Sequence, residues 1–517
     1  MNVWNPFVAW LRRLGWPVLL IALIQFALHL WVAAHDNIFR DELYYVAAGR
    51  HLSPGYVEYP PFVALVAAFE QVVFGATSLI GLRLLPAIAG VVIILLVAGM
   101  VREIGGSRPA QLLAAVGIGL APIFIGSSGL LTMDPFDELW WALVAWLLVR
   151  MIARRQPRLW IALGIAIGVG LLTKLPIAFF VIALLIGLLV SGQRKLLFNR
   201  WLIFGGVIAL VIVSPYLGWQ AVHGFPVVEY TRLYSQGKVF NAGPLGFLAQ
   251  QIITVNPLAL PLWLGGLYFL FFRPEGRPYR AFAWAYVLLY LFFYLQTAKF
   301  YWLSPAYPML FAAGAYGLEL LIRQRPRLAW MERAYTWTLL ISGLIIVPLA
   351  IPILPTETFI RIRQLTGVSQ VKSENLAEGV LPQSFADRFG WKEMAVAVKQ
   401  AYDTLTPAEQ ASVCVIGMNY GETSAVDFYQ SSLGMHVTVI SGHNSYYIWG
   451  PQGCTGDVLI TLGYPLRDLS GSFDSVQDAG AVSCIYCMPY ENGIRVYIAR
   501  GLKAPMQEAW PTTKMYN

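Results

Sequence analysis

Acidic residues that could take a proton from a hydroxyl group gather in two segments of the chain. Asp41 and Glu42 form a pair in the first segment, which also holds Glu58 and Tyr59, and Asp134 opens the second segment. A positioned carboxylate is a common general base. Both segments adjoin long apolar runs, and acidic side chains are costly beside apolar surface at membrane depth, which favours a functional role for them.

A purely structural role stays open for both segments. Asp41 has the right type and place to cap a helix predicted over 41–51. Asp134, followed by Pro135, has the pattern of an N-cap with proline at the first helical position. Asp137 and Glu138 would then complement the positive end of the helix dipole.

Three cations lie at the ends of apolar runs, on the side that otherwise carries few basic residues. They are Arg83, Lys174 and Lys299. Leucine would be cheaper at that depth, so each cation is expected to meet an anion, and a phosphate suits all three because several cations can share its charge. The alternative is that each side chain snorkels to lipid headgroups.

The composition indicates that membrane-spanning segments position these residues. Of 517 residues, 57% are hydrophobic and 12% are charged, and the mean hydropathy is +0.60. Soluble domains carry about 25% charged residues. The chain is therefore predicted to be a polytopic membrane protein, which excludes an ordinary cytosolic enzyme, a disordered protein and a disulfide scaffold.

Apolar runs of the length of a membrane span predict about eleven transmembrane helices. They lie near 16–34, 79–101, 109–128, 136–152, 158–173, 175–191, 201–219, 251–272, 281–298, 302–321 and 334–354. Basic residues such as Arg12, Arg13, Arg150 and Arg323 fall on one side of this map, which the positive-inside rule makes the cytoplasm. The net charge of +8 then reports membrane topology and not nucleic-acid binding.

The map predicts a helical membrane module at 1–355, a linker at 356–379 and a soluble α/β domain at 380–517. Within the module, an external loop at 35–78 carries two helical stretches expected to lie flat in the interface. The last domain is predicted from short β-rich runs at 413–416, 437–440, 458–462 and 494–499 that alternate with helical patterns. An odd number of spans places this domain outside the membrane, in the periplasm of a bacterium.

The C-terminal domain contains further candidates for chemistry. All four cysteines lie there: Cys414, Cys454, Cys484 and Cys487. Disulfides, a zinc site and a redox CxxC pair at 484–487 are the alternatives. A polar, aromatic loop at 441–450 suits carbohydrate binding, or else is a plainly packed loop; its candidate residues are His443, Asn444, Tyr446, Tyr447 and Trp449.

Six short motifs in a fixed order resemble one family. They are the Asp-Glu pair at 41–42, Glu-Tyr-Pro-Pro at 58–61, Arg-Leu-Leu-Pro at 83–86, Asp-Pro at 134–135, Leu-Leu-Thr-Lys-Leu-Pro at 171–176 and Lys-Phe-Tyr-Trp-Leu-Ser-Pro-Ala-Tyr-Pro at 299–308. Over roughly residues 15–350 the chain resembles the GT-C membrane glycosyltransferases, in the clan of the protein O-mannosyltransferases and the lipid A aminoarabinose transferase.

The resemblance implies inverting transfer of a sugar from a polyprenyl-phosphate donor to an acceptor hydroxyl. It implies that Asp41 is the catalytic base, with Glu42 and Asp134 beside it, and that Arg83, Lys174 and Lys299 face the donor phosphate. Glu58 matches an acidic position of the aminoarabinose transferase, but Tyr59 stands where that enzyme has lysine, so neither the sugar nor the phosphate contact carries over directly.

We therefore expect a polyprenyl-phosphate-sugar-dependent glycosyltransferase of a bacterial inner membrane, with a cytoplasmic N-terminus. Its partners would be the lipid-linked donor, a lipid, glycan or protein acceptor, and membrane lipids, without nucleic acid. Glu58, Tyr59, His443, Asn444, Tyr447 and Trp449 are the candidates for contact with the acceptor or with a divalent metal, the one cofactor left open. A transporter or flippase for a lipid-linked sugar is the main rival, and a non-catalytic assembly or sensor protein is a third class.

Overall fold

The structure is a computed structural model, and it describes residues 14–237, 240–367, 371–372 and 374–517. Arg12 and Arg13, which the topology prediction used, lie outside these described residues. Contacts divide the chain into two compact units. The first comprises Met1–His35, Arg83–Gly218 and Val239–Phe359, and the second comprises Asp36–Leu82, Trp219–Lys238 and Ile360–Asn517.

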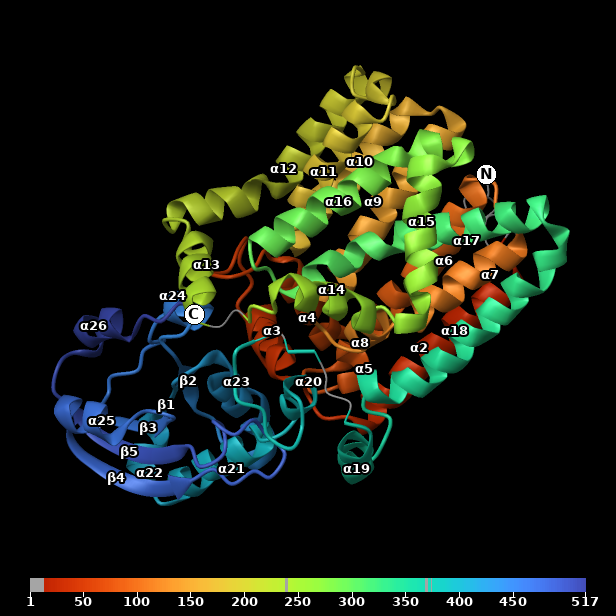
Figure 1. The fold of residues 1–517 in the computed structure, drawn as a ribbon. Helices are drawn as coiled ribbons and strands as arrows, with labels where there is room; N and C mark the ends of the chain where they lie inside the picture. The colour runs from red at the N-terminus through yellow and green to blue at the C-terminus, as the bar shows by residue number, and fades with distance from the viewer. Residues whose placement is uncertain (1–13, 238–239, 368–370, 373) are drawn as a thin grey trace. The chain divides into compact units, whose positions relative to one another are not determined.

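All regular secondary structure among the described residues of the first unit is helical (Figure 1). Its α-helices are α2 (Trp16–His35), α6 (Leu84–Glu103), α7 (Arg108–Gly119), α8 (Pro122–Ser127), α9 (Asp134–Arg154), α10 (Trp160–Thr173), α11 (Ile177–Val190), α12 (Arg200–Val222), α14 (Gly243–Thr254), α15 (Leu260–Phe272), α16 (Arg280–Leu295), α17 (Tyr307–Gln324) and α18 (Ala329–Ala350). Short 3₁₀ helices join several of them, among them η5 (Phe300–Ala306).

Each predicted apolar run coincides with one helix or with two consecutive helices. Two runs are broken by proline: the run at 109–128 divides into α7 and α8 before Pro122, and the run at 251–272 bends by 94° before Pro257. Among the described residues, four helices are long and apolar enough to cross a membrane, or five if the bent pair is one span. The predicted eleven crossings stay a prediction.

Small residues allow the helices of the first unit to pack closely. Helices α15 and α17 cross where Gly266 meets Leu310 and Gly314 meets Leu262. A Cβ atom on Gly314 would lie 1.9 Å from the carbonyl oxygen of Leu262, so glycine is required for this approach. One continuous apolar core joins α6, α7, α9, α11, α15, α16 and α17.

The second unit combines the first external loop with the C-terminal domain. Its helices are α3 (Arg40–Arg50), α4 (Phe62–Phe74), α5 (Leu79–Leu82), α13 (Pro226–Gly237), α20 (Gln383–Ala386), α21 (Trp391–Asp403), α22 (Pro407–Ser412), α23 (Tyr420–Tyr429), α24 (Ser445–Trp449), α25 (Leu466–Ser472) and α26 (Met506–Ala509). Helix α12, from Trp219 onward, and part of α19 (Thr356–Thr366) also belong to this unit, so both helices straddle the boundary. Residues 36–82 were predicted to lie in the membrane module, whereas their contacts join them to the C-terminal domain.

A five-stranded sheet forms the core of the C-terminal domain, in the order β2-β1-β3-β5-β4 (Figure 1). The strands are β1 (Cys414–Gly417), β2 (Thr438–Ile440), β3 (Val458–Leu462), β4 (Phe473–Ala481) and β5 (Arg495–Leu502). Strand β1 pairs in parallel with β2 and β3, while β5 pairs antiparallel with β3 and β4. The predicted combination of a helical membrane module with a soluble α/β domain is confirmed.

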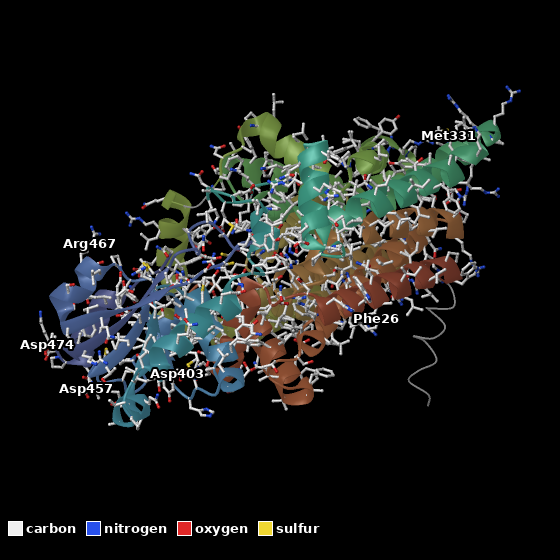
Figure 2. All side chains as sticks on the ribbon, turned by 90° about the horizontal axis from the view of Figure 1, so that it is seen from below. Phe26, Met331, Asp403, Asp457, Arg467 and Asp474 are labelled. Atoms are coloured by element: carbon white, nitrogen blue, oxygen red, sulfur yellow. A yellow bond between two sulfur atoms is a disulfide. The ribbon has the colours of Figure 1, made fainter. Side chains whose placement is uncertain are left out.

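Several charged side chains lie on the surface of this domain. Asp403, Asp457, Arg467 and Asp474 are all exposed, and Figure 2 shows them projecting from the ends of helices, from loops and from strand β4. Strand β4 is the strand that the sequence did not predict. Most of its side chains are exposed, so it lacks the apolar alternation that marks a half-buried strand.

Candidate functional site

The first unit brings Asp134 and Lys174 into an ion pair. Asp134 begins α9 and Lys174 follows the last residue of α10, and the Nζ atom of Lys174 donates to Oδ1 of Asp134 at 2.5 Å. The lysine side chain is 11% exposed and the aspartate side chain 36% exposed. A nearly buried cation needs such a partner. The anion that Lys174 meets in the structure is therefore a carboxylate.

Aromatic rings complete the surroundings of Lys174. Its Nζ atom lies 5.0 Å from the ring centre of Tyr301 and 5.9 Å from that of Trp302. Lys299 lies over the same Tyr301 ring at 5.6 Å. Two of the three predicted phosphate-binding cations thus share one aromatic residue of η5. Tyr301 was not singled out from the sequence, although it stands two positions after Lys299 in a motif that was.

The acidic residues of α9 have other roles than the sequence suggested. Met133, not Asp134, is the N-cap residue, because the helix begins at Asp134. Asp137 is buried and accepts a hydrogen bond from the indole N–H of Trp141 at 2.9 Å. Glu138 is also buried and accepts hydrogen bonds from the hydroxyl groups of Ser127 and Ser304 at 2.7 and 3.2 Å.

Arg83, the third predicted cation, is buried. It precedes α6 in the N-cap position and is 1% exposed. A buried guanidinium requires partners within the protein. In this conformation, Arg83 is held inside the protein, and contact with a lipid phosphate would require an opening beside it.

In the second unit, Asp41 lies inside helix α3 and does not cap it. Phe39 occupies the N-cap position, and Asp41 is the second helical residue. The hydroxyl group of Tyr420 donates to Oδ1 of Asp41 at 2.8 Å. The carboxylate is half-buried, so it is both oriented and accessible, as a general base must be.

Glu42, the neighbour of Asp41, caps the first turn of the same helix. Its side chain is fully buried and accepts the backbone N–H of Phe39 at 2.9 Å, the N3 half of a capping box. The two acids of this pair therefore have different surroundings, because successive helical residues point about 100° apart.

Glu58 forms a second acidic centre in the second unit. Oε1 accepts from the side-chain amide of Asn444 at 2.8 Å and Oε2 accepts from the hydroxyl group of Tyr44 at 3.3 Å. Burial raises the pKa of Glu58 to about 7, while the hydrogen bonds from Tyr44 and Asn444 oppose the shift. Glu58 is thus a carboxyl group that can change its protonation state near neutral pH.

Two polar atoms beside Glu58 lack a hydrogen-bond partner among the described residues. They are the Oδ1 atom of Asn444 and the hydroxyl group of Tyr59, and both are buried. Tyr59 otherwise packs edge-on against the rings of Tyr44 and Tyr45. Buried polar groups are nearly always satisfied, so these two atoms are candidates for hydrogen bonds to a group that is not part of the chain.

The predicted loop at 441–450 divides into structural and accessible residues. His443 is buried; its Nδ1 atom accepts the backbone N–H of Tyr420 at 3.3 Å, and its Nε2 atom lies 2.9 Å from Oδ1 of Asn517. Tyr447 stacks on Trp510, whose indole N–H donates to the Tyr447 carbonyl oxygen at 3.1 Å. His443 and Tyr447 therefore hold the loop against the rest of the C-terminal domain.

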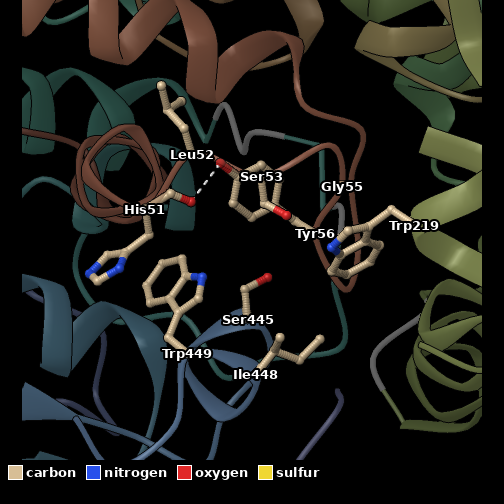
Figure 3. Close-up of a pocket in the computed structure, with 9 residues that line it drawn as sticks. All are labelled: His51, Leu52, Ser53, Gly55, Tyr56, Trp219, Ser445, Ile448 and Trp449. Carbon is tan, nitrogen blue, oxygen red and sulfur yellow. Dashed lines mark hydrogen bonds between the residues drawn. The ribbon is translucent and has the colours of Figure 1, made fainter. Parts of the chain in front are cut away.

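Trp449 instead lines a cavity of about 210 Å³ within the second unit. The lining residues are His51, Leu52, Ser53, Gly55, Tyr56, Trp219, Ser445, Ile448 and Trp449. Figure 3 shows Trp219 on the opposite side of the cavity from Trp449 and His51, with Tyr56 and Ser53 above Ser445 and Ile448. The rings of His51 and Trp449 stack at 4.4 Å. Aromatic walls with hydroxyl groups between them suit a sugar or another flat amphipathic group.

The cysteines form one disulfide and one dithiol. Cys414 of β1 is bonded to Cys454, whereas Cys484 and Cys487 are free. A zinc site built from all four cysteines is therefore wrong, because the first two sulfurs are bonded to each other. Within the described residues, no group of three or more His, Cys, Asp or Glu side chains is arranged to hold a metal ion.

Comparisons with known proteins relate this chain to one group of enzymes. Residues 58–219 match the family model described as dolichyl-phosphate-mannose-protein mannosyltransferase. The lipid A galacturonosyltransferase RgtD of Rhizobium johnstonii is 26% identical over 283 residues, which cover 52% of this chain and 58% of that protein. The undecaprenyl phosphate-alpha-4-amino-4-deoxy-L-arabinose arabinosyl transferase of Pseudomonas aeruginosa is 30% identical over 242 residues, 43% of each chain.

The fold extends the likeness over nearly the whole chain. The crystal structure of ArnT from Cupriavidus metallidurans bound to undecaprenyl phosphate aligns with a TM-score of 0.60 and 18% identity, covering 93% of this chain and 97% of that one. The sequence matches, by contrast, span about half the length of the curated relatives. Together, the family match and the shared fold confirm the resemblance of this chain to the GT-C glycosyltransferases of the protein mannosyltransferase and aminoarabinose transferase clan.

Proposed function

We propose that the protein is an inverting glycosyltransferase that moves a sugar from a polyprenyl-phosphate donor to an acceptor hydroxyl. The observation that carries the proposal is the fold shared with the crystal structure of ArnT from Cupriavidus metallidurans, which is bound to undecaprenyl phosphate. The relatives named for lipid A and for an undecaprenyl-phosphate sugar support a lipid-linked donor and a lipid acceptor.

In this mechanism, the acceptor oxygen attacks the anomeric carbon of the donor sugar. The bond between that carbon and the phosphate oxygen breaks, its electron pair leaves with the polyprenyl phosphate, and the acceptor proton passes to Asp41. The hydrogen bond from Tyr420 at 2.8 Å holds the Asp41 carboxylate in one orientation. A leaving phosphate needs no general acid, so one base suffices.

Lys174 and Lys299 stabilise the phosphate as it leaves. Both lie over the ring of Tyr301, and Asp134 holds Lys174 at 2.5 Å. Cations that are already oriented cost no reorganisation when charge develops on the leaving group. Asp134 in this proposal positions Lys174, and it also partly balances the positive charge of the two lysines.

The acceptor is proposed to bind in the second unit. Trp449 and Trp219 offer apolar faces across the cavity, and the unpartnered Oδ1 atom of Asn444 and hydroxyl group of Tyr59 offer hydrogen bonds beside Glu58. These groups do not by themselves make a metal site, so no step passes through a metal. If Glu58 binds one, activity should fall with a chelator and return with the added divalent ion.

The protein is further proposed to span the inner membrane with its C-terminal domain in the periplasm. The distribution of basic residues supports this orientation. A periplasm-dependent reporter fused after Asn517 should be active and a cytoplasm-dependent reporter silent. The reverse result would contradict the orientation.

Release of polyprenyl phosphate from a labelled polyprenyl-phosphate sugar tests the proposed reaction. Purified protein should release the lipid phosphate in the presence of a lipid extract that contains acceptors, and label should appear in that extract. A flippase would instead move the labelled lipid between the leaflets of a vesicle without breaking the sugar–phosphate bond. That outcome would overturn the proposal.

A further inference from the structure

The two free cysteines have unequal surroundings. They lie in the turn between β4 and β5, where Cys487 is 6% exposed and Cys484 is partly exposed. The backbone N–H of Cys487 donates to the Sγ atom of Cys484 at 3.1 Å. The sulfur that solvent can reach is therefore also the sulfur that accepts a hydrogen bond, as a thiolate does.

Gly390 allows the chain to pass directly over both sulfurs. A Cβ atom at this position would lie 3.0 Å from the Cβ atom of Cys487 and 3.4 Å from the Sγ atom of Cys484. The φ angle of Gly390 is +95°, which favours glycine. Gly390 is also the N-cap residue of α21, so the accessible sulfur lies beside the positive end of a helix of 13 residues.

The charges and hydrogen bonds around the pair act on the two thiols in opposite directions. The hydrogen bond with Cys487 lowers the pKa of the Cys484 thiol to about 7, with help from the backbone N–H groups of Cys487 and Tyr486, while burial and the charge of Glu393 oppose the shift. The same hydrogen bond, burial and the charge of Glu491 raise the pKa of Cys487. This asymmetry is the one that thiol–disulfide exchange uses.

We propose that Cys484 and Cys487 form a reversible thiol–disulfide exchange site whose partner is a small or protein disulfide. The Cys484 thiolate attacks one sulfur of that disulfide, forms a mixed disulfide and releases one thiolate. The Cys487 thiol then loses its proton and attacks the Cys484 sulfur, which releases the second thiol. Two cysteine thiols are oxidised to one disulfide, and the partner disulfide is reduced to two thiols.

Ile485 supports an encounter with such a partner. It lies between the two cysteines and is 82% exposed, although it is a large apolar residue. The site does not depend on the proposed sugar transfer, because none of its residues contributes to the base, the cations or the cavity. The Cys414–Cys454 disulfide is a separate, structural bond.

The test uses the full chain in detergent, reduced with dithiothreitol, desalted and then treated with 4,4′-dithiodipyridine at pH 7. The wild type should release two equivalents of thiopyridone and keep no adduct, with its mass lowered by two hydrogens at the peptide containing 484–487. Cys487→Ser should release one equivalent and retain the adduct on Cys484. Cys484→Ser should react at least ~10-fold more slowly, because its remaining thiol is buried.

Peptide mapping assigns every adduct, so reduction of the Cys414–Cys454 bond would be seen and would not be mistaken for the proposed reaction. Three outcomes would overturn the proposal. The wild type could retain an adduct on each cysteine, the two serine variants could react at equal rates, or the pair could remain closed after dithiothreitol. Stoichiometric zinc that protects both thiols would overturn it as well.

Discussion

The first and second units each hold carboxylates, but they surround them in opposite ways. Asp134 of the first unit faces the full positive charge of Lys174 at 2.5 Å. Glu58 of the second unit is held by a tyrosine hydroxyl group and a side-chain amide, and its pKa is raised to about 7. A carboxylate beside a cation positions that cation, whereas a buried carboxylate held by neutral donors can take up a proton near neutral pH. We therefore expect phosphate anchoring in the first unit and proton chemistry in the second.

The largest expected effect comes from the base. Asp41→Asn should lower kcat by about 10² or more, because the amide cannot accept the acceptor proton. Donor binding should persist, since the predicted phosphate contacts lie in the first unit. Turnover of a labelled polyprenyl-phosphate sugar, measured beside donor affinity, checks both statements.

Glu42→Gln is the matched control for Asp41→Asn. Glu42 accepts the backbone N–H of Phe39 at the start of helix α3, and glutamine retains an oxygen acceptor for this hydrogen bond. This variant should keep kcat within a few-fold of the wild type and change mainly the melting temperature. Full activity of Asp41→Asn, or equal losses in both variants, would remove Asp41 from its assigned role.

Lys174→Met should weaken donor binding by ~10-fold or more, because it removes an oriented cation and leaves Asp134 to repel the phosphate. Lys299→Met should have a smaller effect, since its ammonium group is farther from the shared Tyr301 ring. Lys195→Met, at an exposed position of the same unit, serves as the control. Unchanged donor affinity in both test variants would contradict the division between the units.

Trp449→Ala should raise the acceptor KM several-fold, in line with the ~1 kcal/mol typical of an aromatic contact. Tyr447→Ala should instead lower the melting temperature, because Tyr447 stacks on Trp510 within the domain core. Steady-state kinetics and thermal unfolding of the two variants separate these effects. An unchanged KM in Trp449→Ala would exclude the cavity as the acceptor site.

The smallest effect concerns stability as a function of pH. Burial raises the pKa values of Glu58, Asp387 and Glu422 to about 7 and that of Glu491 to about 8. A carboxyl group with a raised folded pKa binds more protons in the folded state, so stability should fall as pH rises from about 5 to about 8. Glu58→Gln should flatten this slope by its own share in thermal unfolding scans, and an unchanged slope would exclude Glu58 as a contributor.

Much of the fold followed from the sequence. Apolar runs predicted the helical segments of the first unit, and β-rich runs predicted four of the five strands, because both signals depend on local periodicity. Strand β4 was not predicted, because it lies at the sheet edge and has few buried side chains. The grouping of residues 36–82 with the C-terminal domain was also not predicted, since no local pattern encodes contacts between segments more than 300 residues apart.

The candidate site was predicted in residue type more than in arrangement. Lys174 and Lys299 were expected near one another and do share Tyr301. The partners Asp134–Lys174 and Asp41–Tyr420 were not foreseen, because side-chain pairing depends on tertiary packing. The cap position that the sequence offered as an alternative for Asp41 lies two residues after the observed N-cap, Phe39, and that for Asp134 lies one residue after the observed N-cap, Met133. Helix ends are the least certain part of any such pattern.

The hydrogen bond between Asp41 and Tyr420 joins residues 379 positions apart. During synthesis, helix α3 emerges long before the segment that completes its surroundings, and most of the apolar helices are made in between. The ordering of Asp41 must then be among the last events of folding, because a contact of such long range forms only after the chain between its ends exists. A nascent or prematurely terminated chain would contain the proposed base without the hydroxyl group that orients it. We therefore expect the membrane-inserted chain to lack sugar-transfer activity until the segment around Tyr420 has been synthesised and has folded.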